Sequence, residues 1–114
     1  MTIFKSLFST KNHESEQFEV LGVNAYKEAV INKDVQLIDV RTPREYRSGH
    51  LGKAINIDYH KRKEFIDAFE TLNKEKPLYI YCRSGVRSAK AAHKLIAMGF
   101  KKIYDLEGGI MNWR

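Results

Sequence analysis

The chain has 114 residues, enough for one compact domain and too few for two ordinary ones. With 43% hydrophobic and 30% charged residues, its composition excludes a disordered or fibrous protein, and no segment approaches membrane-spanning length. The formal charge of +6 is compatible with attraction to small anions, acidic membranes or nucleic acid. Because the basic residues are spread out and no RNA-binding motif is present, neither nucleic acid nor a membrane is expected as a partner.

The cysteine content bears on compartment and cofactors. Cys82 is the only cysteine, so no disulfide can form within the chain. The four histidines are scattered and show no metal-ligand spacing with it. Together with the lack of a secretory signal, these features predict a cytoplasmic protein that needs no metal and no organic cofactor.

The first half of the chain predicts a polar leader followed by the start of the domain. Residues 1–17 are expected to be a flexible leader, and residues 18–114 the domain. A short strand is expected at 18–21, and a helix over about 25–32 with Asn24 as its N-cap. The apolar, β-branched run at 35–40 predicts a buried strand, and Pro43 with Glu45 opens a short helix that Gly49 ends.

The second half continues the alternation of strands and helices. A short strand is expected at 54–57, then an amphipathic helix over about 61–72. The apolar face of that helix is expected to consist of Phe65, Ile66, Phe69 and Leu72. Pro77 begins a strand that delivers Cys82, and the next helix runs to about Met98. A last strand over 102–105 leads to a terminal turn that contains Trp113.

Regular alternation of this kind predicts an α/β domain, with a mostly parallel sheet covered by helices on both faces. In such folds ligands bind beyond the carboxyl ends of the strands. Cys82 lies at such an end, which makes it the main candidate for a functional residue.

The residues after Cys82 distinguish it from an ordinary buried cysteine. A lone cytosolic cysteine is usually a small buried hydrophobe. Here the polar, basic loop between the strand and the following helix favours an anion-binding cradle with Cys82 as the catalytic nucleophile. Gly85 allows a tight loop, the backbone amides are expected to point inward, and two guanidiniums add positive charge. The expected substrate-binding residues are Arg83, Ser84, Gly85, Val86, Arg87 and Ser88.

The rest of the sequence narrows the chemistry of this cysteine. His93 falls on the polar side of its helix, so a histidine-activated, protease-like mechanism is disfavoured. No second cysteine is available for dithiol exchange within the chain. Sulfur relay through a single thiol needs neither an activating histidine nor a second cysteine.

Three stretches of the sequence resemble the rhodanese family over nearly the whole domain. They are residues 37–57 (LIDVRTPREYRSGHLGKAINI), the loop at 79–88 (YIYCRSGVRS) and the end at 106–113 (LEGGIMNW). The resemblance implies a parallel five-stranded α/β domain that moves a sulfane sulfur from an anionic donor such as thiosulfate to a thiol or cyanide. It also implies that Cys82 carries a persulfide, that Arg83 and Arg87 meet the charge of the donor, and that the loop amides hold the terminal sulfur.

Two alternatives to this hypothesis stay open. The first is a sulfur-relay or protein-binding module with little small-molecule turnover. The second is a cysteine phosphatase or arsenate reductase, which the loop disfavours because only four residues separate Cys82 from Arg87. The charged residues at 39, 41, 44 and 45 are interpreted as pairing and capping groups of the scaffold. The physiological donor and acceptor and the oligomeric state are left undetermined.

Overall fold

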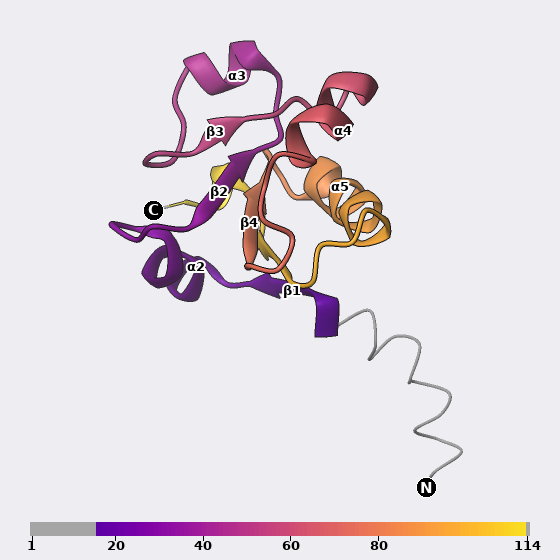
Figure 1. The fold of residues 1–114 in the computed structure, drawn as a ribbon. Coiled ribbons are helices and arrows are strands. Elements are labelled where there is room, and N and C mark those ends of the chain that lie inside the picture. Colours follow the sequence, from indigo (N-terminus) through magenta and orange to yellow (C-terminus); the bar gives the residue numbers. More distant parts are fainter. Residues whose placement is uncertain (1–15, 114) are drawn as a thin grey trace, which may run out of the picture.

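A computed structural model describes residues 16–113, so the predicted leader lies almost entirely outside the described residues. Strands and helices alternate along the chain (Figure 1). The strands are β1 (Phe18–Leu21), β2 (Gln36–Asp39), β3 (Ile55–Asn56), β4 (Leu78–Tyr81) and β5 (Ile103–Leu106). The helices are α2 (Val23–Val30), α3 (Pro43–Arg47), α4 (Arg62–Phe69), α5 (Val86–Ala97) and the 3-10 turn η1 (Ile110–Asn112).

The five strands form one sheet in the order β1-β5-β4-β2-β3, and every pairing between neighbours is parallel. The predicted α/β class and parallel sheet are therefore confirmed. β4 occupies the centre, between β2 and β5, and is hydrogen-bonded on both sides. This central position matters because the residue that follows β4 is Cys82, which is therefore held by a strand with hydrogen-bonded neighbours on both sides.

Helices cover both faces of the sheet (Figure 1). On one face α4 and α5 pack over apolar side chains of β2, β4 and β5. The largest buried side chains there include Phe65, Phe69, Leu95 and Ile80. On the other face α2 packs through Tyr26 and Val30. The two faces are buried separately because successive side chains of a strand point in opposite directions.

Two details of the predicted helices are wrong. α2 begins at Val23 with Gly22 as its N-cap, because the Gly22 carbonyl accepts the Tyr26 amide at 2.9 Å; Asn24 lies inside the first turn. α4 ends at Phe69 rather than Leu72. Ile66 is 41% exposed, since Phe65 and Phe69 form the buried stripe and the next residue points about 100° around the helix.

No helix in the described part of the chain combines the length and apolar character needed to cross a bilayer.

Candidate active site

The loop between β4 and α5 wraps around the sulfur of Cys82. Gly85 has a left-handed backbone, with φ of 106°, which brings its amide back toward the residue three positions earlier. The Sγ atom accepts the Gly85 N–H at 3.0 Å and the Ser88 N–H at 3.4 Å. The sulfur therefore lies at the N-terminus of a 12-residue helix, where unpaired amides and the helix dipole stabilise negative charge.

Cys82 is deeply buried, with 1% of its surface exposed, and its side chain borders the apolar core. Burial alone would agree with a small structural hydrophobe. The neighbours of the sulfur do not agree with that role. The sulfur accepts two backbone amides, and it also lies 3.4 Å from the Ser88 hydroxyl. The two backbone N–H donors serve no purpose around an apolar group, whereas they suit a sulfur atom that takes part in anionic chemistry.

The last turn of the domain holds the other side of this loop. The Ile110 amide donates to the Cys82 carbonyl at 2.9 Å, and the Met111 amide donates to the Arg83 carbonyl at 3.1 Å. Gly109, with φ of 67°, allows this approach: a Cβ atom there would lie 2.3 Å from the Arg83 carbonyl oxygen. The sequence predicts this segment as a terminal turn and does not predict that it holds the Cys82 loop. The paired glycines at 108 and 109 could have indicated such a close approach.

Arg87 is held from outside the loop by Glu45 of α3. Its two terminal nitrogens donate to the Glu45 carboxylate at 2.7 and 2.9 Å. The same carboxylate accepts the Thr42 amide in a capping box at the start of α3. The bond from Arg87, followed by the Thr42 amide, lowers the pKa of Glu45 to about 2. Bonding to Glu45 raises the pKa of Arg87, and the nearby Cys82 sulfur adds to this effect.

Asp39 and Arg41, two of the charged residues predicted to be scaffold groups, form scaffold contacts. Asp39 is fully buried and pairs with Arg41 at 2.7 Å. Arg41 also donates to the Gly49 carbonyl at 2.7 Å, which ties the end of β2 to the turn after α3. His50 lies in that turn, and its Nδ1 is 3.1 Å from the Tyr46 carbonyl oxygen.

A second carboxylate approaches the cysteine from β5 and was missed by the sequence analysis. Asp105 accepts the Ser88 hydroxyl at 3.0 Å and is only 3% exposed. Burial raises its pKa to about 7, against the smaller opposing effects of the Ser88 bond and the Leu106 amide. The available signal was an acidic residue inside the otherwise apolar strand Ile103–Leu106.

The remaining predicted loop residues are more accessible. Arg83 and Ser84 are exposed, and Val86 is 61% exposed. Of the loop amides expected to point inward, those of Gly85 and Ser88 have hydrogen bonds to the sulfur. The loop thus presents a buried sulfur beneath an exposed, basic rim.

Comparison with known proteins decides the family. The family model described as Rhodanese-like domain matches residues 23–114. The chain belongs to the rhodanese family.

Relatives of this rhodanese domain have different names and lengths. Thiosulfate sulfurtransferase GlpE of Coxiella burnetii is 34% identical over 87 residues, which cover 76% of this chain and 78% of that protein. tRNA uridine(34) hydroxylase of Pelagibacter ubique is 32% identical over 105 residues; the match covers 92% of this chain but only 34% of the hydroxylase. The crystal structure of a rhodanese-like domain protein from Staphylococcus aureus has a TM-score of 0.70 at 31% identity, over 83% of this chain and 90% of that chain.

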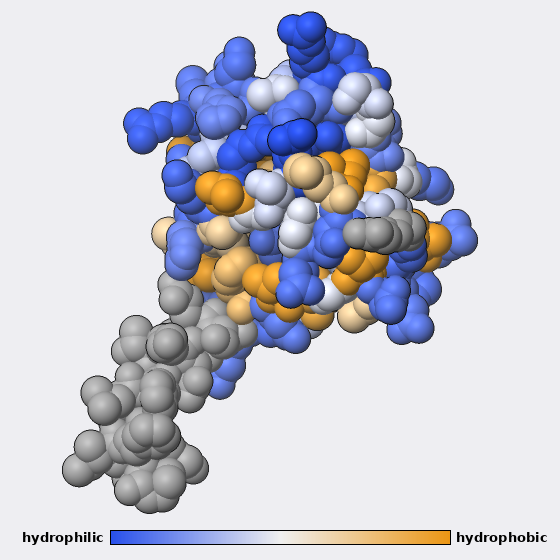
Figure 2. Space-filling model, turned by 180° about the vertical axis from the view of Figure 1, so that it is seen from behind, coloured by the Kyte–Doolittle hydropathy of each residue, from blue (hydrophilic) through white to orange (hydrophobic). Residues whose placement is uncertain are grey.

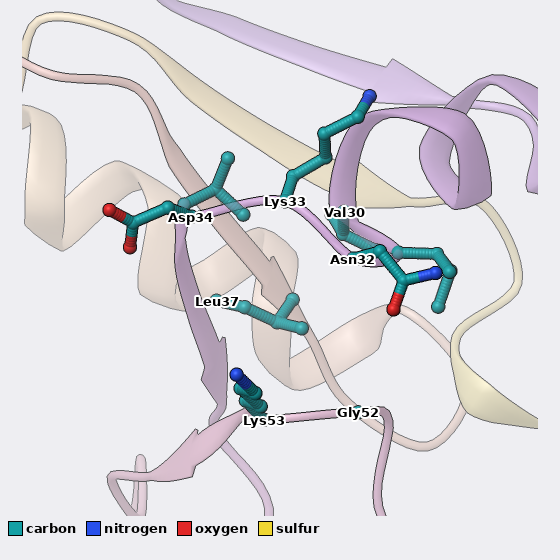
Figure 3. A pocket seen from close by; sticks show the side chains of 9 residues that line it. Val30, Asn32, Lys33, Asp34, Leu37, Gly52 and Lys53 are labelled. Carbon is teal, nitrogen blue, oxygen red and sulfur yellow. The ribbon is translucent and has the colours of Figure 1, made fainter.

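The surface of the rhodanese domain has two further features. Hydrophilic side chains cover its upper part, at the height where Figure 1 places α3 and α4 (Figure 2). Exposed basic residues on these helices include Arg44, Arg47, Arg62 and Lys63. A separate hollow of about 610 Å³ lies between the α2–β2 loop and the Gly52–Lys53 turn, with Leu37 between them (Figure 3). Its described lining residues include none from the Cys82 loop, so it is not part of this site.

Proposed function

We propose that this protein is a sulfurtransferase in which Cys82 accepts a sulfane sulfur from an anionic donor such as thiosulfate and passes it to a thiol or cyanide. One observation carries the proposal: the Cys82 sulfur accepts backbone N–H bonds from Gly85 and Ser88 at the start of α5. A site built this way stabilises an anionic sulfur before and after it gains a second sulfur atom. Relatives named thiosulfate sulfurtransferase support the same class of reaction.

In the first step the Cys82 thiolate attacks the outer sulfur of thiosulfate. A sulfur–sulfur bond forms to Cys82 as the bond between the outer and central sulfur atoms of the donor breaks, and its electron pair leaves with sulfite. The products are a Cys82 persulfide anion and sulfite, so charge is conserved and no external oxidant is needed. The backbone amides that point toward Cys82 then donate hydrogen bonds to the terminal sulfur of the persulfide.

In the second step an acceptor nucleophile attacks that terminal sulfur. With cyanide the product is thiocyanate, and with a thiolate it is a new persulfide. In both cases the electron pair of the broken bond returns to Cys82 as thiolate, which restores the enzyme. One cysteine completes the cycle.

Two arginines supply the positive charge of the loop in this scheme, and each has a different role. Arg87, fixed by Glu45, provides a constant charge beside the sulfur, and its pKa responds to Cys82. Arg83, which is exposed on the loop, meets the donor as it arrives. Fixing one cation and leaving the other accessible gives both stable electrostatics and an entry point for a dianion.

Thiosulfate-dependent formation of thiocyanate tests the proposal. Wild-type protein should turn over, whereas Cys82→Ser should not. Arg83→Ala should raise the KM for thiosulfate roughly threefold, because an exposed charge contributes less than about 1 kcal/mol. Lys90→Ala, which removes an exposed charge from α5, is the matched control.

Three outcomes separate the proposal from its alternatives. Turnover by Cys82→Ser, or an unchanged KM in Arg83→Ala, contradicts the assigned roles. A Cys82 persulfide that forms from thiosulfate but does not react with cyanide indicates relay to a protein thiol. Cys82-dependent hydrolysis of p-nitrophenyl phosphate would instead indicate phosphatase chemistry.

A further inference from the structure

The Ser88 hydroxyl is surrounded by more acceptors than it can serve. Its oxygen lies 3.4 Å from the Cys82 sulfur, 3.3 Å from the Gly85 carbonyl oxygen and 3.0 Å from Asp105 Oδ2. A hydroxyl has one proton to donate and two lone pairs that accept. If Asp105 is ionised, all three neighbours compete for one proton, and a charged Cys82 sulfur faces a lone pair of oxygen.

The surroundings of Asp105 favour a proton on its carboxyl. Its side chain is buried, and Oδ1 has no hydrogen-bond partner among the described residues. The groups that act on it there are the Ser88 hydroxyl from α5 and the Leu106 amide of its own strand; burial outweighs both and raises the pKa to about 7. On α2, burial and then the charge of Asp105 raise the pKa of Tyr26, whose hydroxyl donates to the Ile80 carbonyl and not to Asp105. No cation appears among these described groups.

We propose that Asp105 is a positioning residue that controls, through Ser88, whether a hydroxyl proton is donated to the Cys82 sulfur. When Asp105 is protonated, its O–H donates to Ser88 Oγ, and the Ser88 proton is free to point at Cys82. When Asp105 loses its proton to solvent, it accepts the Ser88 hydroxyl instead, and the sulfur loses that donor. The biological meaning of this switch rests on the proposed function, in which the Cys82 sulfur carries the reaction.

The switch opposes the usual pH dependence of a thiol. As pH rises, Asp105 ionises, and it then both withdraws a hydrogen bond from the Cys82 sulfur and adds a negative charge two hydrogen bonds away. A unit charge separated from the sulfur by contacts of 3.0 and 3.4 Å, at an effective dielectric constant of about 20, changes an ionisation constant by up to roughly a hundredfold. Partial compensation is expected, because a less stabilised thiolate is a stronger nucleophile.

The rate of alkylation of Cys82 by iodoacetamide, measured against pH, tests the proposal. Asp105→Asn keeps the shape of the side chain and removes its ionisation. The ratio of the variant rate to the wild-type rate should be close to one at about pH 5 and should rise to about tenfold at about pH 8. Asp67→Asn, which removes an exposed carboxylate of α4, should give a ratio near one throughout.

A double-variant comparison shows whether Ser88 mediates the effect. In a Ser88→Ala background the same Asp105→Asn change should alter the alkylation ratio less than in the wild type. An equal change in both backgrounds would show that Asp105 acts as a bare charge, which contradicts the proposal. A pH-independent ratio would reduce Asp105 to a structural role and would also overturn it.

Carbon-13 NMR of the Asp105 carboxyl in wild-type protein gives the same test without a substitution. The carboxyl should titrate near pH 7. Titration below about pH 5, close to the ordinary range of aspartate, contradicts the proposal. Neither measurement requires sulfur transfer, so thiocyanate formation measured on the same samples separates failure of this inference from failure of the proposed function.

Discussion

Gly109→Ala is expected to damage the Cys82 loop far more than the rest of the domain. Gly109 packs against the backbone of the loop at Arg83 and Ser84. An added Cβ would lie 2.3 Å from the Arg83 carbonyl oxygen and 2.6 Å from the Ser84 nitrogen. Both neighbours are backbone atoms, so no flexible side chain can move aside. The clash must displace the loop or the terminal turn.

The size of the effect follows from two separate costs. A left-handed backbone at a residue with a Cβ costs about 1–2 kcal/mol. Overpacking adds about 1–3 kcal/mol, so the free energy of unfolding should fall by roughly 2–5 kcal/mol. Relief of the clash requires a shift on the order of 1 Å, and a misplacement of that size costs about a hundredfold in rate. The kcat for thiocyanate formation should therefore fall by about two orders of magnitude.

Gly52→Ala is the matched control, since Gly52 also has a left-handed backbone, with φ of 46°, but a Cβ there meets nothing within 4 Å. It should lose only about 1–2 kcal/mol of unfolding free energy and keep its kcat within about twofold. Urea denaturation and steady-state kinetics on both variants give the comparison. If Gly109→Ala keeps a kcat within about twofold of Gly52→Ala, the terminal turn does not set the loop geometry.

The ionisable groups of the site give two further predictions, both measured by urea denaturation against pH. Glu45 has a lowered pKa of about 2, so its pair with Arg87 stabilises the fold above the ordinary range of glutamate and is lost as pH falls toward 2. Glu45→Gln should lose about 1 kcal/mol at neutral pH, allowing for solvent screening, and should match the wild type near pH 2; an equal loss at both would refute the ion-pair argument. The contribution of Asp105 to stability has the opposite pH dependence, because its pKa is raised to about 7. Its contribution is present below the ordinary range of aspartate and is lost as pH rises to about 7, on the order of 4 kcal/mol at most. Asp105→Asn should therefore gain stability relative to the wild type between about pH 4 and pH 8, and a constant difference would contradict this.

The sequence carried enough information for the fold because its local signals agree with one another. Alternating apolar strands and amphipathic helices require a parallel sheet with two covered faces. The position of Cys82 at a strand end and the glycine three residues later predicted a loop closed around the sulfur. In the structure the amides of Gly85 and Ser88 donate hydrogen bonds to that sulfur. These features depend on neighbours along the chain, which a sequence displays directly.

The parts that sequence reasoning missed depend on contacts between distant segments. Arg87 was expected to face a donor, yet it is paired with Glu45, 42 residues away, a partner that no local pattern reveals. Asp105 meets Ser88 only because β5 lies beside β4 in the sheet, and strand order is not written in the alternation of elements. The missed N-cap of α2 is a smaller error at a helix end, where assignments are least determined, and the outward Ile66 is an error in the width of the apolar face of α4.

The central claim is that Cys82 stores one extra sulfur atom, and intact-protein mass spectrometry after exposure to thiosulfate tests it most directly. The wild-type protein should gain the mass of one sulfur, and subsequent addition of cyanide should remove that mass with release of an equal amount of thiocyanate. Cys82→Ser should gain nothing. A wild-type mass that stays unchanged under non-reducing conditions, or an equal gain in Cys82→Ser, would contradict the account.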